Sequence, residues 1–261
     1  MEILDKIYYI NLIRRPERNT HFVNQYLQAE LPINKLERFN AIDGSHYTFT
    51  DEELHLFRNV DYKNKKHNKN IYGNQLSHHY ILKEMIKHNY KYILICQDDT
   101  IFCKNFVEHL NNVLNNIPSD AEIINIGTHK FACFDYFEKW NLENTLEQDY
   151  AMIGSSSVNE YVCKCNRNHN PCSLAYIVTL KGAIAYTELK ENAGFCTSTD
   201  GDYNTYLYFK KINYISKKVL CTGESDFKSD IFVNNEFDQV KHNFKNDINL
   251  NLNLNDNKNN E

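Results

Sequence analysis

Apolar residues in this chain gather in short, nearly unbroken runs, separated by segments with a single apolar face. Residues 6–12, 90–99 and 121–127 contain runs of the kind found in strands buried on both faces of a parallel sheet. Residues 106–117 instead repeat apolar side chains at helical spacing, and Pro118 ends that pattern. This alternation of strands and helices predicts an α/β fold with a mostly parallel sheet and helices on both faces.

Turn and capping signals predict further elements. Residues 36–44 are predicted as a second strand that closes in a turn at Asp43 and Gly44. Thr50 and Glu53 have the spacing of a capping box that opens a short helix. The other predicted elements are a helix at residues 75–89, a strand and helix at 173–192, a helix at 200–212 and a strand at 213–223.

The domain organisation is predicted to be simple. Residues 1–244 form one domain, because they contain no internal repeat and no linker rich in Pro, Gly and Ser. Residues 129–172 have no clear periodicity and are predicted as an irregular lid or binding insertion. The lysine-rich residues 59–70 are predicted as a mobile loop, and the low-complexity residues 245–261 as a disordered tail.

Composition and charge exclude several classes of function. The 261 residues are 42% hydrophobic and carry a net charge of −5, which indicates a folded core and no basic surface for nucleic acid. No apolar run is long enough to span a bilayer, and the charged opening segment does not resemble a signal peptide. The 8 cysteines are therefore predicted as reduced thiols, and the protein as cytoplasmic. The Asn- and Lys-rich composition leaves a bacterium, a parasite or a large DNA virus open as the source, and for a virus the expected location is the host cytoplasm or the virion.

Two adjacent carboxylates, Asp98 and Asp99, follow the apolar run of residues 92–96. In a parallel α/β sheet, ligands bind beyond the carboxyl ends of the strands, where this pair is expected to lie. Adjacent carboxylates repel each other unless a proton or a cation intervenes, and Mg²⁺ or Mn²⁺ held this way commonly bridges to phosphates. The pair therefore predicts a metal and diphosphate site. The alternative is that one Asp caps the next helix and the other is solvated.

Seven sequence blocks in one order resemble glycosyltransferase family 25: IYYINLIRRPERN, RFNAIDG, LSHHYIL, YILICQDDTIF, AEIINIG, LAYIVTLKGA and TDGDYNTYL. The resemblance implies a single-domain, Rossmann-like GT-A fold and transfer of a sugar from a nucleoside diphosphate donor. It departs from the family at Gln97, where the E-D-D motif has Glu. Losing that negative charge is expected to weaken metal binding without abolishing it.

The predicted donor site combines residues from several blocks. Asp98 and Asp99 are the predicted ligands of Mn²⁺ or Mg²⁺, and Arg15 or Arg18 lies close to a helix start, where anions bind. The alternative for either arginine is ordinary solvation. The donor-binding residues, partly implied by the family blocks, are Asn11, Leu12, Arg15, Arg18, Asp43, Ser77, His78 and Asp98.

A second acidic pair, Asp200 and Asp202, is predicted to supply the catalytic base. Sugar transfer requires a group that takes the proton of the acceptor hydroxyl, and the family match implies an acidic residue at the start of this helix. Asp200 can equally be a helix N-cap, and which of the two acts is left open.

A rival metal site is formed by Cys163, Cys165, His169 and Cys172, whose types and number suit a tetrahedral zinc ion. Their spacing is tighter than in common zinc modules, and free thiols are the alternative. Such a zinc ion would be structural and would pin the predicted lid.

Together these features predict a metal-assisted hexosyltransferase that uses a UDP-sugar, and the resemblance implies inversion at the anomeric carbon. The resemblance also makes galactose the first expectation for the sugar, followed by glucose or N-acetylglucosamine, with a glycan or a hydroxylysine hydroxyl as the acceptor. The alternative is a catalytically inactive transferase-like module that binds carbohydrate or protein. A nucleotidyltransferase is less favoured, because the chain lacks a Gly-rich phosphate loop. The oligomeric state is not readable from the sequence.

Overall fold

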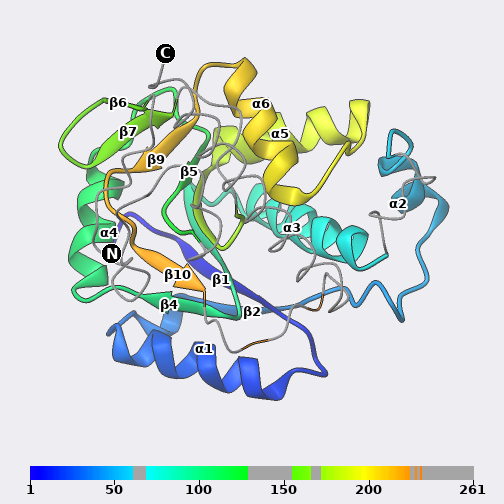
Figure 1. Cartoon of the computed structure of the whole chain (residues 1–261), viewed down its shortest axis with the longest axis horizontal. Coiled ribbons are helices and arrows are strands. Elements are labelled where there is room, and N and C mark those ends of the chain that lie inside the picture. The colour runs from blue at the N-terminus through cyan, green and yellow to red at the C-terminus, as the bar shows by residue number, and fades with distance from the viewer. Residues whose placement is uncertain (61–68, 129–154, 166–171, 224–226, 228–229, 231–261) are drawn as a thin grey trace, which may run out of the picture. The chain divides into compact units, whose positions relative to one another are not determined.

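A mixed sheet crosses the structure, a computed structural model that describes residues 1–60, 69–128, 155–165, 172–223, 227 and 230 (Figure 1). Within these residues, eight strands pair in the order β2-β1-β3-β8-β5-β9-β7-β6. They are β1 (Lys6–Asn11), β2 (Leu36–Asn40), β3 (Tyr92–Gln97), β5 (Ile123–Asn125), β6 (Ser155–Ser157), β7 (Val162–Cys165), β8 (Ala175–Thr179) and β9 (Tyr214–Ser216). A separate two-stranded sheet pairs β4 (Thr100–Phe102) with β10 (Cys221–Gly223).

Strand β8 runs against its two neighbours, β3 and β5. Strand β1 is parallel to β2 and β3, and β5 is parallel to β9, so β8 and β7 are the strands that run against the others. All five residues of β8 are buried, and such a strand has the same apolar pattern whichever way it runs. The α/β class is confirmed, with two strands reversed in the sheet.

The helices cover both faces of the sheet (Figure 1). On one face, Tyr9 of β1 stacks on Phe22 of α1 with ring centroids 4.4 Å apart, and Phe102 contacts both Phe22 and Phe106 of α4. On the other face, α3, α5 and α6 pack together beside β8. The helices are α1 (Pro16–Gln28), α2 (Asp51–Leu56), α3 (Lys69–Lys87), α4 (Phe106–Asn115), α5 (Leu180–Ala193) and α6 (Thr199–Phe209), with a short 3-10 helix at Ile33–Lys35.

Local signals place several of these helix starts. The predicted capping box is confirmed: Thr50 accepts from the Glu53 backbone N–H, and the Glu53 carboxylate accepts from the Thr50 N–H at 2.8 Å. The first turns of α3 lie against the loop after β2, because each of these two segments has a glycine where they meet, Gly73 on α3 and Gly44 in the loop. A Cβ at Gly73 would meet the Ile42 carbonyl oxygen at 2.3 Å. This close approach places α3 beside the loop that carries Asp43.

Parts of the predicted element pattern are wrong. Residues 129–172 were expected to be irregular, but β6 and β7 lie there, and β7 pairs with β9. The serines of β6 carry no apolar signal, so the sequence pattern could not show this strand. The strand expected at residues 213–223 is divided into β9 and β10, which belong to different sheets.

The chain divides into two compact units, Met1–Ser225 and Asp226–Glu261. The first holds the helices and strands given above. The predicted disordered tail at residues 245–261 and most of the predicted loop at residues 59–70 lie outside the described residues.

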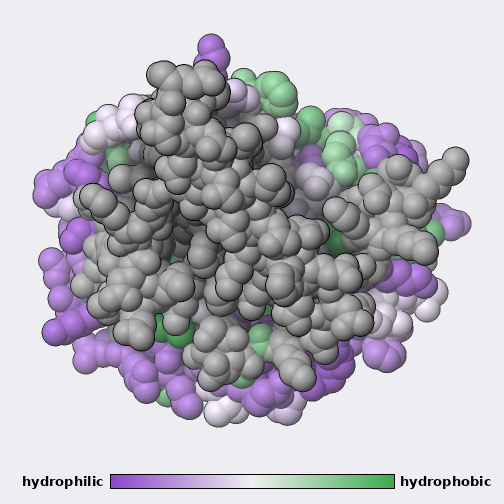
Figure 2. All heavy atoms as spheres, in the orientation of Figure 1, coloured by the Kyte–Doolittle hydropathy of each residue, from purple (hydrophilic) through white to green (hydrophobic). Residues whose placement is uncertain are grey.

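The visible part of the described surface in Figure 2 is mainly hydrophilic, with hydrophobic side chains scattered along its rim. Among the described helices, none combines the length and apolar character required to cross a bilayer.

Candidate functional site

The carboxyl ends of β1, β3 and β5 lie at one edge of the sheet, because these strands run in the same direction. Each ends in a polar residue that is at least partly buried: Asn11 on β1, Gln97 on β3 and Asn125 on β5. Asp98 and Asp99 follow β3 directly and are 5% and 7% exposed. The predicted position of the acidic pair at a strand end is therefore confirmed.

Asp98 is held by two buried partners on different elements. Its Oδ2 accepts a hydrogen bond from Asn11 Nδ2 at 2.6 Å, and its Oδ1 accepts from Arg18 Nη1 at 2.8 Å. Pro16 at the start of α1 begins the helix just after β1, so the first turn of α1 carries Arg18 back to the strand ends. Asn11 also donates to the Arg15 carbonyl oxygen, which ties this turn to the cluster.

The buried ion pair fixes both charges in orientation. Burial raises the pKa of Asp98, the Arg18 guanidinium opposes that rise, and the neighbouring Asp99 carboxylate adds to it. Arg18 therefore offsets much of the cost of placing two carboxylates together in a buried position.

This donor set fits a divalent cation that is shared with a phosphate-bearing ligand. Mg²⁺ and Mn²⁺ need only one or two protein carboxylates when phosphate oxygens and water complete the shell. Asp98 and Asp99 provide two adjacent carboxylates whose mutual repulsion a cation would relieve. The described residues contain no group of three or more His, Cys, Asp or Glu arranged to hold a metal by themselves.

The loop after β1 meets the loop after β2 through an exposed ion pair. Arg14 Nε lies 2.6 Å from Asp43 Oδ2, and His46 Nδ1 lies 3.2 Å from the same oxygen. Burial works to raise the pKa of Asp43, but the hydrogen bonds from Arg14 and His46 outweigh it and hold that pKa below its usual value. Arg15 instead forms an ion pair with Glu17 at 3.2 Å, and half-buried Leu12 accepts the Arg15 backbone N–H.

Ser77 and His78, expected in the donor site, have other partners on α3. Ser77 Oγ accepts from the Ile42 backbone N–H at 2.9 Å and donates to the Gly73 carbonyl at 2.7 Å, so it fastens the loop before Asp43. His78 Nδ1 lies 2.6 Å from the hydroxyl of Tyr176, so this contact joins α3 to strand β8. Burial lowers the pKa of His78 to about 3, so its ring is neutral.

Asp202 is the most enclosed of the candidate catalytic residues. Its oxygens accept from Lys190 Nζ at 3.1 Å, from Gln75 Nε2 at 3.0 Å and from the backbone N–H groups of Cys196 and Thr197. Burial raises its pKa, and Lys190 opposes the rise. Donors from α3, α5 and the loop before α6 thus occupy this carboxylate, which indicates an anchoring role.

Asp200 is half-buried and lies on the side of α6 that meets the sheet edge. Its Oδ2 accepts the Cys172 backbone N–H at 3.1 Å. The next residue, Ser173, accepts from Gln97 Nε2 at 3.0 Å, immediately before the acidic pair. The segment that leads into β8 therefore connects Asp200 to the end of β3, and the two predicted acidic motifs share one edge of the sheet.

The predicted zinc set is only partly within the described residues. Cys163 and Cys165 are buried on β7 and pack with Ile215 and Val219 in a small apolar cluster. His169 lies outside the described residues, so the zinc site stays a prediction.

The sequence interpretation missed Lys190 and Gln75, which hold Asp202. A signal for Lys190 was present: it continues the stripe of Ala183, Tyr186 and Thr187, which are all buried on α5. A lysine at the end of a buried stripe indicates a buried acidic partner, because an unpaired ammonium group is costly to bury.

Comparisons with family models and curated proteins show the family to which this chain is related. The family model described as Glycosyltransferase family 25 (LPS biosynthesis protein) matches residues 4–199. A "Glycosyltransferase 25 family member" of Aedes aegypti is 26% identical over 70% of this chain and 28% of its own length. "Procollagen galactosyltransferase 2" of Homo sapiens is 25% identical over 69% of this chain and 26% of its own length.

The chain therefore spans about a quarter of the length of the curated relatives it matches. Among solved structures, the crystal structure of A197 from STIV aligns with 87% of this chain and 97% of its own, at 7% identity and a TM-score of 0.37. The family model covers well over half of the residues, and the resemblance seen in the sequence is thus confirmed: the chain belongs to glycosyltransferase family 25.

Proposed function

We propose that this chain transfers a hexose from a UDP-sugar to an acceptor hydroxyl, with inversion at the anomeric carbon, on a GT-A-like fold. The observation that carries the proposal is the position of Asp98, Asp99 and Asp200 along one edge of the sheet. Membership of a glycosyltransferase family supports the same reaction class.

The donor diphosphate is proposed to bind beside the acidic pair. Asp98 and Asp99 would hold Mn²⁺ or Mg²⁺, which when bound neutralises the negative charge that develops on the departing diphosphate. Arg18 and Asn11 keep the Asp98 carboxylate in a fixed orientation. Arg14 and Arg15, which are partly exposed on the loop after β1 and paired with Asp43 and Glu17, can offer guanidinium donors to the diphosphate.

Asp200 is the proposed base. As the acceptor oxygen forms its bond to the anomeric carbon, the bond from that carbon to the UDP oxygen breaks, and Asp200 takes the acceptor proton. The geometry favours Asp200 over Asp202. Among the described residues Asp200 accepts the Cys172 N–H, whereas Asp202 is occupied by Lys190 and several further donors.

Galactose is the first sugar to test, because one relative is named a procollagen galactosyltransferase, and glucose and N-acetylglucosamine follow. The proposed acceptor is a glycan or a hydroxylysine hydroxyl. The test measures UDP release from each UDP-sugar with Mn²⁺ or with EDTA, using water as a poor acceptor. Asp99→Asn should lose release and weaken Mn²⁺ binding measured by electron paramagnetic resonance.

Asp51→Asn is the matched control, since Asp51 is exposed on α2 and should change neither signal. Release that does not depend on metal, or that survives in Asp99→Asn, would refute the role given to the acidic pair. Sugar binding without any release of UDP would instead support an inactive carbohydrate-binding module.

A further inference from the structure

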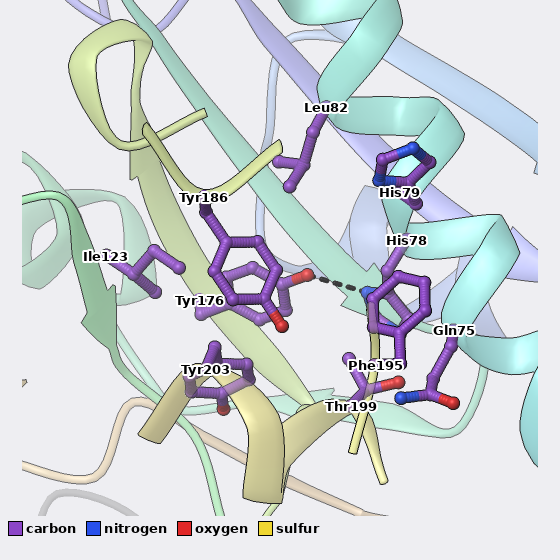
Figure 3. Close-up of a pocket in the computed structure, with 10 residues that line it drawn as sticks. All are labelled: Gln75, His78, His79, Leu82, Ile123, Tyr176, Tyr186, Phe195, Thr199 and Tyr203. Atoms are coloured by element: carbon purple, nitrogen blue, oxygen red, sulfur yellow. Dashed lines mark hydrogen bonds between the residues drawn. The ribbon is translucent and has the colours of Figure 1, made fainter. Parts of the chain in front are cut away.

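A narrow cavity lies between α3, α5, α6 and β8 (Figure 3). Aromatic rings make up much of its wall, with Tyr176 from the sheet, Tyr186 from α5 and Tyr203 from α6. Its open space is on the scale of a single water molecule. The cavity is therefore too small for a sugar or a nucleotide.

Four buried polar atoms belong to side chains that line this space. They are His78 Nε2, His79 Nδ1, the Tyr186 hydroxyl and Gln75 Oε1, and within the described part of the chain none of them has a hydrogen-bond partner. Their residues are 3%, 3%, 6% and 1% exposed, so bulk solvent does not reach them. Native structures rarely leave such groups unsatisfied, because desolvating them without a partner is costly.

The lining groups are neutral. Burial keeps the His78 ring uncharged and raises the pKa of the Tyr186 hydroxyl well above its usual value. His78 Nδ1 is already bonded to the Tyr176 hydroxyl, so Nε2 is the ring atom that still needs a partner. A neutral hydroxyl and a neutral imidazole suit a water molecule, which both donates and accepts, and do not suit an ion.

We propose that this cavity holds one ordered water molecule that bridges His78 Nε2 on α3 and the Tyr186 hydroxyl on α5. The bridge adds a buried polar link between the two helices, beside apolar groups such as Leu82 and Phe195 and apart from the exposed ion pair of Lys83 with Glu191. Buried waters of this kind have two to four polar partners and are costly to remove. This inference does not depend on the proposed transferase reaction.

The substitution Tyr186→Phe tests the bridge through the sign of its effect. If the water is present, removing the hydroxyl breaks one hydrogen bond and should raise the equilibrium constant of unfolding about fivefold. If the cavity is dry, the same change removes an unsatisfied polar group and should lower that constant. Tyr26→Phe is the matched control, because its hydroxyl donates directly to the Pro32 carbonyl at 2.7 Å and its loss should destabilise in either case.

A high-resolution crystal structure of the native protein gives an independent reading. Density for a water within hydrogen-bond distance of both His78 Nε2 and the Tyr186 hydroxyl would support the proposal. An empty cavity, or a stabilised Tyr186→Phe protein, would overturn it.

Discussion

The two acidic motifs are built alike and differ in what surrounds them. In each, one carboxylate forms a buried ion pair with a cation from a neighbouring helix: Asp98 with Arg18 at 2.8 Å, and Asp202 with Lys190 at 3.1 Å. In the first motif Asp98 is proposed to hold the metal together with Asp99, whereas in the second only Asp200 is proposed to meet the substrate. The same kind of ion pair thus accompanies a carboxylate of the proposed site in one motif and an anchoring carboxylate in the other.

The pairs also differ in how the chain brings them together. Lys190 and Asp202 are 12 residues apart, and Asp202 also accepts backbone N–H groups from the loop between α5 and α6. Arg18 and Asp98 are 80 residues apart, and they meet because β1 and β3 are paired in the sheet. The first pair closes a local loop, whereas the second depends on the assembled sheet and lies at the edge where the donor is proposed to bind.

The largest expected effect comes from removing either cation. Arg18→Met and Lys190→Met should each lower the free energy of unfolding by about 3–5 kcal/mol, because each leaves a buried carboxylate without its partner. Denaturant unfolding measures both. Lys83→Met is the control, since the ion pair of Lys83 with Glu191 is exposed and should contribute less than about 1 kcal/mol. Equal results for all three variants would contradict the burial argument.

Smaller effects, on the rate of transfer and on stability, should distinguish the role of Asp200 from that of Asp202. Asp200→Asn should reduce the rate of sugar transfer on the order of 10²-fold while leaving stability nearly unchanged, because it removes the base but keeps a side-chain oxygen that can accept the Cys172 N–H. Asp202→Asn should lower the unfolding midpoint, because it leaves Lys190 buried and unpaired. Transfer assays and denaturant unfolding on both variants decide this. A stable but inactive Asp202→Asn protein would reverse the assignment.

The substitution Gln97→Glu tests whether the metal binds beside Asp98 and Asp99. The added negative charge beside Asp98 and Asp99 should tighten Mn²⁺ binding about fivefold, the equivalent of about 1 kcal/mol of added charge attraction. The contact with Ser173 can persist, because a serine hydroxyl can donate where it now accepts from Gln97. Mn²⁺ titration followed by electron paramagnetic resonance measures the change. Unchanged or weaker binding would place the metal away from this strand end.

The smallest expected effect is on the pH dependence of stability. The pKa values of Asp98 and Asp202 are raised above 3.8 by burial, so the folded state binds these protons more tightly than the unfolded chain does. Their contribution to the free energy of unfolding should fall as pH rises from 3.8 through the raised folded pKa values, and stay constant above them.

Glu53 should contribute with the opposite sign. Burial tends to raise its pKa, but hydrogen bonds from Tyr80, Thr50 and Tyr47 outweigh this and lower it below 4.5. The stability that Glu53 adds is present above pH 4.5 and is lost as pH falls through its folded pKa. Unfolding midpoints of Asp98→Asn and Glu53→Gln against pH should therefore change in slope in opposite directions. Changes of the same sign would contradict the assigned causes.

The local features of this protein follow from residues that are neighbours in the chain. The apolar runs gave β1, β3 and β5, the helical spacing gave α4, and Thr50 with Glu53 gave the start of α2. The sequence also placed Asp98 and Asp99 at a strand end. Each of these depends on residues that are close in the chain, where periodicity and capping act.

The direction of β8 and the cation that pairs with each buried carboxylate instead depend on how distant segments pack together. A fully buried strand has the same pattern in either direction, and its direction follows from how the sheet assembles. Asp98 and Asp202 look alike in the sequence. Their roles diverge because α1 carries Arg18 to the sheet edge, whereas α5 places Lys190 inside the helix layer, and these packing contacts are not encoded by neighbouring residues.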